Sequence, residues 1–170
     1  MIIDLNSFEQ GTRPFEIVLK GDELDLEIDD ARIAGTVIAS GGVTKQIAQT
    51  DVAGRIEAPL EVDCSRCLEP VGQIIVVDFG VSFVAPEDFA ADKEREIGEA
   101  DLETDVLSSD SIDLKDVVRE QILLNLPTQV FCREDCKGLC QKCSANRNLI
   151  DCNCEEKEID PRWAALKSIE

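Results

Sequence analysis

The stretch TDVAGRIEAPLEVDCSRCLEPVGQIIVVDFGVSFV, residues 50–84, carries the clearest structural signal in the chain. It holds two runs that are rich in Val and Ile and partly alternate apolar with polar residues, a pattern typical of β-strands. Between the runs lie Cys64 and Cys67, spaced C-x2-C and followed by a Pro and a Gly. We therefore expect two strands, with a cysteine pair at the end of the first.

Similar runs lie before this stretch. They are FEIVLK at 15–20, LDLEID at 24–29 and ARIAGTVIAS at 31–40, and the run that ends at Cys64 extends back to residue 43. The pairs Gly21-Asp22, Asp29-Asp30 and Gly41-Gly42 separate them and are expected to form tight turns. Short strands joined by turns predict an antiparallel meander or a small open barrel.

The hydrophobic period changes in SIDLKDVVREQILLNLP, residues 111–127. Asp113 is a suitable N-cap and Pro127 lies beyond the end, so we predict a helix near residues 113–125 that covers one face of the sheet. Its apolar stripe consists of Leu114, Val117, Val118 and Ile122.

Two further segments have weaker patterns. Residues 86–105 are mostly charged and predict a surface loop or a marginal helix. Asp160 and Pro161 can begin a short helix in the last eleven residues, DPRWAALKSIE. The chain is thus predicted to be α+β, with a strand-rich body over 1–131 and a cysteine-rich, zinc-knuckle-like tail over 132–170.

Charge is distributed unevenly over the 170 residues. Residues 132–170 hold 7 basic and 8 acidic side chains, whereas residues 1–131 hold 10 and 28, for a formal net charge of −19 in all. Because nucleic-acid binding depends mainly on cations, the body is a poor candidate for direct RNA contact and suits a basic protein partner better. Solubility alone explains the acidity equally well. The tail cations are open to two readings, phosphate contact or simple solvation; they are Lys137, Lys142, Arg147 and Arg162.

The ends and the hydropathy of the chain indicate a soluble cytoplasmic protein. The first residues lack a basic region followed by an apolar stretch, so no secretory signal is expected. No window approaches the roughly 20 apolar residues of a membrane span. Thiols are kept reduced in the cytosol, where clustered cysteines bind metal more often than they form disulfides.

The eight cysteines fall into four pairs, which are Cys64 and Cys67, Cys132 and Cys136, Cys140 and Cys143, and Cys152 and Cys154. Facing pairs of this kind place four thiolates tetrahedrally around zinc, so one or two structural zinc ions are possible. The spacing favours a distal site made of the last four cysteines. The first four then form a second site that fastens the strands to the segment after the helix. In the alternative partition the two C-x2-C bends share one site.

Other uses of these cysteines are less favoured. A redox C-x2-C motif sits at a helix N-terminus, whereas Cys67 is followed by another strand. An iron–sulfur cluster needs the same thiolates, but the spacings match no common ferredoxin pattern. The chain has no His, which rules out cysteine–histidine and serine–histidine catalysis, and an all-cysteine zinc site has no open position for water. We therefore predict that the protein is not an enzyme.

Several blocks resemble the large-ribosomal-RNA-subunit accumulation family, the YceD-like proteins. They are CSRCLEP, the helix end ILLNLP, then CREDCKGLCQKC, CNC and DPRWAALK, in the family's order from Cys64 to Lys167. Two positions depart from the family pattern, because Ser144 stands where a Gly is usual and Arg147 where a Leu is usual. A Gly readily takes the left-handed conformation of such a bend.

The resemblance implies a non-enzymatic cytosolic protein needed for normal accumulation of large-subunit (23S) ribosomal RNA. Together with the acidic body, it leads to the hypothesis of a ribosome-biogenesis factor that binds a basic ribosomal protein or an assembly intermediate, with zinc in a structural role. The alternative is a redox- or metal-responsive regulator that uses the cysteines as a switch. The sequence indicates neither an oligomeric state nor any residue that contacts RNA.

Overall fold

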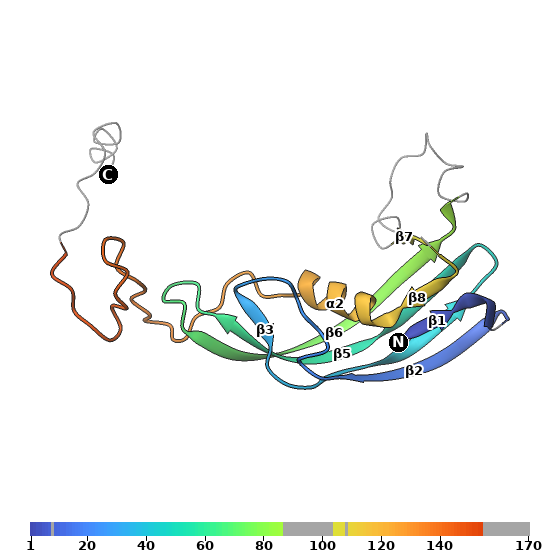
Figure 1. Cartoon of the computed structure of the whole chain (residues 1–170), viewed down its shortest axis with the longest axis horizontal. Helices are drawn as coiled ribbons and strands as arrows, with labels where there is room; N and C mark the ends of the chain where they lie inside the picture. The colour runs from blue at the N-terminus through green and yellow to red at the C-terminus, as the bar shows by residue number, and fades with distance from the viewer. Residues whose placement is uncertain (8, 87–103, 108, 155–170) are drawn as a thin grey trace, which may run out of the picture.

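The computed structural model of the chain, shown in Figure 1, describes residues 1–7, 9–86, 104–107 and 109–154. Its main sheet has six strands, in the order β2-β4-β5-β6-β7 with β3 added beside β5. They are β2 (Gly11–Leu19), β3 (Ala31–Ile33), β4 (Val37–Lys45), β5 (Gln49–Asp63), β6 (Pro70–Val84) and β7 (Thr104–Val106). Strand β1 (Ile2–Asp4) pairs with β8 (Ser111–Asp113) in a small second sheet, and a 3-10 turn, Leu5–Ser7, follows β1.

The longest pairing joins β5 and β6. All fifteen residues of each strand are in register, from Gln49 opposite Val84 to Asp63 opposite Pro70. Alternate residues of β5 face the core, and Val52, Ile56 and Ala58 are fully buried there. This alternation is the period-2 pattern seen in the sequence, so the two predicted strands are confirmed and lie side by side.

Helix α2 (Leu114–Leu124) packs on this core. Its N-cap is Asp113, whose carboxylate accepts a hydrogen bond of 3.0 Å from the backbone N–H of Lys115. The predicted stripe of Leu114, Val117, Val118 and Ile122 is buried. Figure 1 shows α2 lying along the concave side of the curved sheet, as expected for a covering helix.

The fold is strand-rich, as predicted, but the sheet is mixed. Strands β4, β5 and β6 form an antiparallel meander, whereas β7 runs parallel to β6. In the described part of the chain β2 and β7 end the strand order and do not pair with each other, so the sheet does not close on itself.

The predicted strand at residues 24–29 was wrong. The segment is irregular, with Glu27 at a positive φ of 58°. Leu24 and Leu26 are nevertheless buried, and Arg119 of α2 donates hydrogen bonds to the carbonyl oxygens of Asp25 and Leu26. The alternation of its first two leucines therefore reflects burial in the core without a neighbouring strand, whereas Ile28, the third apolar residue of the run, is exposed.

The turn expected at Gly41-Gly42 was also wrong. Both glycines lie inside β4, and the chain turns instead at residues 46–49, where the N–H of Gln46 donates to the carbonyl oxygen of Gln49 at 2.9 Å. Gly41 is opposite Gly54 of β5, and a Cβ on Gly41 would lie 2.6 Å from the Gly54 Cα. The glycines therefore allow a close approach of two strands.

The turn expected at Gly21-Asp22 is present, and the N–H of Glu23 donates to the carbonyl oxygen of Lys20 at 2.9 Å. Most of the charged segment predicted over 86–105, and the short helix predicted from Asp160, lie outside the described residues. None of the helices in the described ranges has the length and apolar character that a membrane crossing requires.

Replacing Gly41 with Ala tests this close approach. We expect Gly41→Ala to lower the free energy of unfolding by about 1–3 kcal/mol, the usual range for overpacking, because the new methyl group would press on the backbone of β5. Gly80→Ala is the matched control, since a Cβ there would meet nothing within 4 Å. Urea unfolding followed by circular dichroism measures both, and equal unfolding curves for the two variants would contradict the prediction.

Candidate metal centres

Four thiols meet at the end of the β5–β6 hairpin. Cys64 and Cys67 lie in the turn after β5, while Cys132 and Cys136 lie in the segment after α2. Their Sγ atoms are all within 4.8 Å of one another. We call this group the proximal site.

The spacing of these sulfurs fits a metal ion. Sγ of Cys64 lies 3.9 Å from that of Cys136, and Sγ of Cys67 lies 3.6 Å from that of Cys132. Tetrahedral zinc with Zn–S bonds of about 2.3 Å places its sulfurs about 3.8 Å apart. A disulfide needs about 2.0 Å, and all eight cysteines are free thiols.

The hairpin turn is shaped by its own backbone. The N–H of Leu68 donates to the carbonyl oxygen of Cys64, and the N–H of Cys64 donates to that of Glu69, both at 2.9 Å. Leu68 takes a φ of 60° to close this bend. Val130 is held against it, because its carbonyl oxygen accepts a 2.8 Å hydrogen bond from the N–H of Ser65.

The other four thiols form a second group, the distal site, which consists of Cys140, Cys143, Cys152 and Cys154. Its C-x2-C bend repeats the first one. The N–H of Ser144 donates to the carbonyl oxygen of Cys140, and the N–H of Cys140 to that of Ala145, both at 2.9 Å. Ser144 has a φ of 56°, so it adopts the left-handed conformation for which a Gly is usual at this place.

The two groups of four are those that the cysteine spacing favoured, and the two C-x2-C bends do not share a site. The groups differ in exposure. In the proximal site Cys64, Cys67 and Cys136 are buried, whereas in the distal site Cys143 and Cys154 are exposed. The prediction that the eight thiols bind metal stays a prediction. A metal ion in the proximal site would be more shielded from water than one in the distal site.

Arg66 and Asn148 support the proximal site and were missed in the sequence. The Arg66 guanidinium donates hydrogen bonds of 3.1 and 3.0 Å to the carbonyl oxygens of Glu134 and Cys136, and lies 4.3 Å from the centre of the Phe131 ring. The Asn148 side chain donates to Sγ of Cys136 at 3.2 Å. Arg66 lies inside CSRC, but its partners are far along the chain, so spacing gave no signal.

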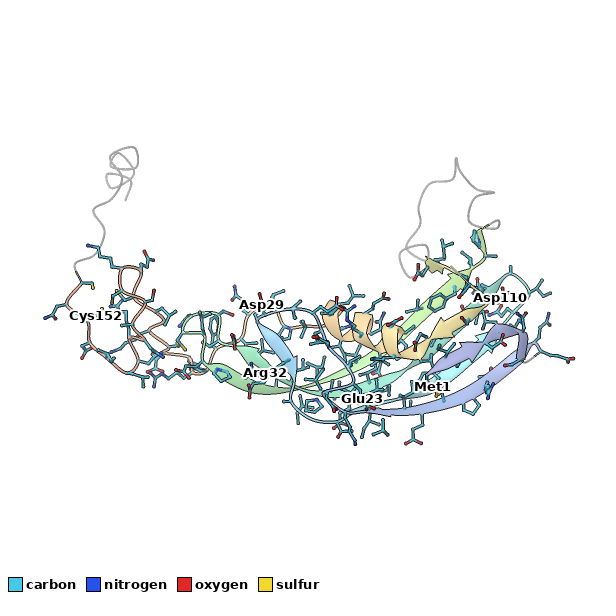
Figure 2. All side chains as sticks on the ribbon, viewed as in Figure 1. Met1, Glu23, Asp29, Arg32, Asp110 and Cys152 are labelled. Atoms are coloured by element: carbon cyan, nitrogen blue, oxygen red, sulfur yellow. The ribbon has the colours of Figure 1, made fainter. Side chains whose placement is uncertain are left out.

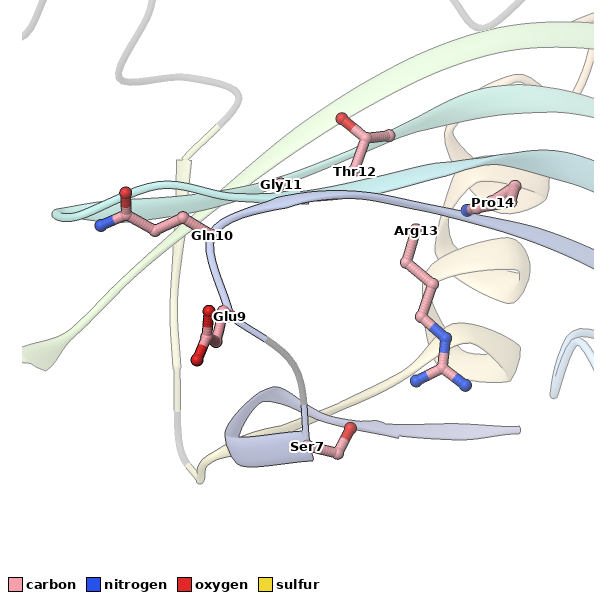
Figure 3. A pocket seen from close by; sticks show the side chains of 7 residues that line it. All are labelled: Ser7, Glu9, Gln10, Gly11, Thr12, Arg13 and Pro14. Carbon is pink, nitrogen blue, oxygen red and sulfur yellow. The ribbon is translucent and has the colours of Figure 1, made fainter.

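A shallow hollow lies near the start of β2. Its volume is about 570 Å³, and the side chains of Glu9, Gln10 and Arg13 lie around it (Figure 3). It is lined by a single stretch of chain at its exposed surface and holds no thiol, so it is a poorer candidate for a functional site than the cysteine groups.

Comparison with known proteins places this arrangement in a family. The model of the large ribosomal RNA subunit accumulation protein YceD family matches residues 52–170, which include most of β5, all of β6 and α2, and all eight cysteines. The chain belongs to the YceD family. The name describes the accumulation of ribosomal RNA and gives no enzymatic reaction.

Relatives in the YceD comparison come from bacteria and plants. An uncharacterized protein of Mycobacterium tuberculosis is 35% identical over 115 residues, covering 68% of this chain and 53% of that protein. The large ribosomal RNA subunit accumulation protein YCED homolog 1, chloroplastic, of Zea mays is 26% identical over 92% of this chain and 60% of its own length. The uncharacterized protein YlbN of Bacillus subtilis is 25% identical over 99% of this chain and 94% of its own length.

The chain spans about half the length of the first curated relatives it matches. No solved structure matches this YceD chain.

The metal-free thiols of the proximal site differ in acidity. Burial acts to raise the pKa of Cys64, but backbone N–H groups of Arg66, Cys132 and Cys67 point at its sulfur and bring the pKa down to about 6. Desolvation raises the pKa of Cys132 to about 12, and burial raises that of Cys67. At neutral pH the metal-free proximal site therefore holds a Cys64 thiolate beside protonated Cys67 and Cys132.

In the distal site the backbone N–H groups of Cys143 and Lys142 lower the pKa of Cys140 to about 6. A hydrogen bond with Cys143 raises the pKa of Cys154 to about 12. In the proximal site burial acts to raise the pKa of Cys136, but hydrogen bonds, above all the one from Asn148, lower it. Each site thus has at least one thiol of lowered pKa that can capture an ion first, and other thiols that lose a proton when they bind it.

Zinc affinity of the proximal site is expected to rise with pH. Because at least Cys67 and Cys132 must release their protons to bind, the apparent association constant should increase by at least about two decades per pH unit between pH 6 and 8. Below about pH 6 Cys64 also becomes protonated, so the dependence should steepen. Competition with a chelator, in a variant whose distal cysteines are serines, measures this dependence. An affinity that does not change with pH would refute it.

Single-ligand variants should separate the two sites. Cys136→Ser and Cys154→Ser are each expected to reduce bound zinc from two equivalents to one, as measured by elemental analysis of the purified protein. Only Cys136→Ser should greatly lower the free energy of unfolding, by about 4 kcal/mol, because the proximal site cross-links distant segments of the chain. Equal destabilisation by both variants would show that the proximal site is no more structural than the distal one.

Proposed function

We propose that the chain is a non-enzymatic ribosome-biogenesis factor that acts in the cytoplasm and supports the accumulation of large-subunit (23S) ribosomal RNA. The observation that carries this proposal is the family match over residues 52–170. The named relatives of Zea mays and Arabidopsis thaliana, both chloroplastic, bear the same description of large ribosomal RNA subunit accumulation.

The proposed partner is a basic ribosomal protein or an assembly intermediate that presents one. An acidic loop over residues 22–30 supports this choice, since its six carboxylate side chains belong to exposed residues (Glu23 and Asp29 are labelled in Figure 2). Within the described ranges one of them, Glu27, forms an ion pair, with Arg119 at 2.8 Å. A surface of this sign repels RNA phosphates and attracts lysine and arginine side chains.

In this proposal zinc has a structural role. Four cysteines fill the coordination sphere of a zinc ion and leave no position for a substrate. The ion in the proximal site would fix the segment after α2 against the β5–β6 turn, and the one in the distal site would close the tail on itself. Both would shape the protein for binding and take no part in a reaction.

Depletion of the protein tests the cellular role. We expect large-subunit ribosomal RNA to fall while small-subunit RNA stays near its normal level, which gel quantification of total RNA and sucrose-gradient profiles would measure. Re-expression of the intact chain should restore the ratio of the two RNAs. An equal loss of both RNAs would contradict a selective role in the large subunit.

A further inference from the structure

The main sheet has one face that no described segment covers. Figure 1 shows α2, β1 and β8 on the concave side, where the side chains of the core also lie. The convex side carries the other half of the alternating residues of β2, β4, β5 and β6. A sheet face turned to water normally bears polar side chains, so apolar groups on it call for an explanation.

Four large apolar side chains lie on this convex face. They are Val18 of β2, Ile38 of β4, and Ile74 and Val76 of β6, and between 45% and 68% of the surface of each is exposed. A single exposed apolar residue is ordinary, but four on neighbouring strands form a surface.

The strand register brings these residues together. Val18 is opposite Ile38, Ile38 is opposite Glu57, and Glu57 is opposite Val76, so three of the apolar residues lie with Glu57 in one row across β2, β4, β5 and β6. Ile74 lies beside this row, two residues from Val76 on the same face. Directly opposite side chains are about 5 Å apart at their Cβ atoms. We call Val18, Ile38, Glu57, Ile74 and Val76 the outer patch.

Glu57 gives the outer patch its charge. In the adjacent row Arg55 pairs with Asp78 at 3.1 Å, and two rows away on the other side Arg32 forms an ion pair with Glu61. Within the described ranges no such cation accompanies Glu57, which sits between Ile38 and Val76. Glu16, one row away on β2, is exposed and likewise has no ion pair among the described residues.

We propose that the outer patch binds a protein segment in which lysine or arginine side chains stand beside aliphatic ones. The cation would pair with Glu57, and the aliphatic groups would cover Ile38, Val76 and their neighbours. This inference rests on the proposed function and names the surface that would serve it. Charge complementarity selects the occupant, because the chain has a formal net charge of −19.

Two other occupants fit less well. A second copy of the chain would bring two acidic molecules together, and a symmetric contact centred on the patch would bring two Glu57 side chains together. RNA would bring phosphates to Glu57 and Glu16, and the patch offers no cation to receive them.

The first test titrates the full-length, zinc-loaded protein with a short fluorescent peptide of alternating lysine and leucine. Peptides that alternate lysine with serine, and glutamate with leucine, are the controls for the apolar and the charged part of recognition. We expect only the lysine–leucine peptide to bind well, and to bind more weakly as salt is raised. Methyl NMR should show the largest shifts at Val18, Ile38, Ile74 and Val76. Shifts confined to other surfaces would overturn the proposal. Because this test uses the unmutated protein, it does not depend on whether any variant folds.

Paired variants locate the binding energy. Glu57→Gln should weaken peptide binding about fivefold, and the double variant Ile38→Thr with Val76→Thr about tenfold. The matched controls remove the same groups elsewhere. Glu9→Gln acts near the start of β2, outside the outer patch and the acidic loop, and Ile47→Thr acts at the β4–β5 turn, where Ile47 is 91% exposed. The controls should change binding less than twofold. An equal effect of Glu9→Gln and Glu57→Gln would mean that only the overall charge matters, and would refute the patch.

Cell experiments distinguish failure of this inference from failure of the proposed function. Outer-patch variants that fold and bind zinc but lose the peptide should fail to restore large-subunit RNA after depletion. Full restoration by those variants would overturn the patch as the functional surface and leave the ribosomal role intact. If depletion itself leaves large-subunit RNA unchanged, the proposed function fails, and the patch can then no longer be its binding surface.

Discussion

The pairing of β5 with β6 is the interaction on which the rest of the structure depends. Because β5 is long, β4 and β3 can both pair with it, one after the other along its length. The hairpin also presents a broad apolar surface that α2 covers. The turn at its far end presents Cys64 and Cys67 beyond the body of the sheet. One hairpin therefore sets both the core and the position of the thiols, and its alternation leaves a second face for other contacts.

The proximal site completes what the hairpin begins. It brings together thiols 65 residues apart in sequence, Cys67 and Cys132, and a cross-link over such a loop restricts the unfolded chain by about 4 kcal/mol in the chain-entropy model. Arg66 aligns the two segments independently of any ion, through the carbonyl oxygens of Glu134 and Cys136. The protein thus has a partly preorganised site, and the thiols need little rearrangement to receive a metal.

Sequence patterns predicted the elements whose signals are local. Helix α2, its Asp113 cap and its buried stripe follow from a 3.6-residue period and local capping signals, whereas spacing favoured the observed grouping of the cysteines but left a second partition open. The errors came from non-local causes. Gly41 is needed for contact with Gly54, which a Gly-Gly pair in sequence does not distinguish from a turn, and Leu24 and Leu26 alternate because a helix lies over them. The real turn at Ile47 has no Gly, Asn or Asp to mark it, and the roles of Arg66 and Asn148 depend on segments that only folding brings together.

The all-cysteine composition of the two sites has an electrical consequence. A zinc ion held by four thiolates carries a formal charge of −2, so filling both sites would take the chain from the formal −19, which counts every thiol as protonated, to about −23. Residues 132–170, nearly neutral when their thiols are protonated, would then have the same sign as the body. Metal content would thus act as a charge modification as well as a clamp. The zinc-loaded protein would be the stronger polyanion, with a lower isoelectric point. It would also hold more counterions around it, which a cationic partner would displace on binding.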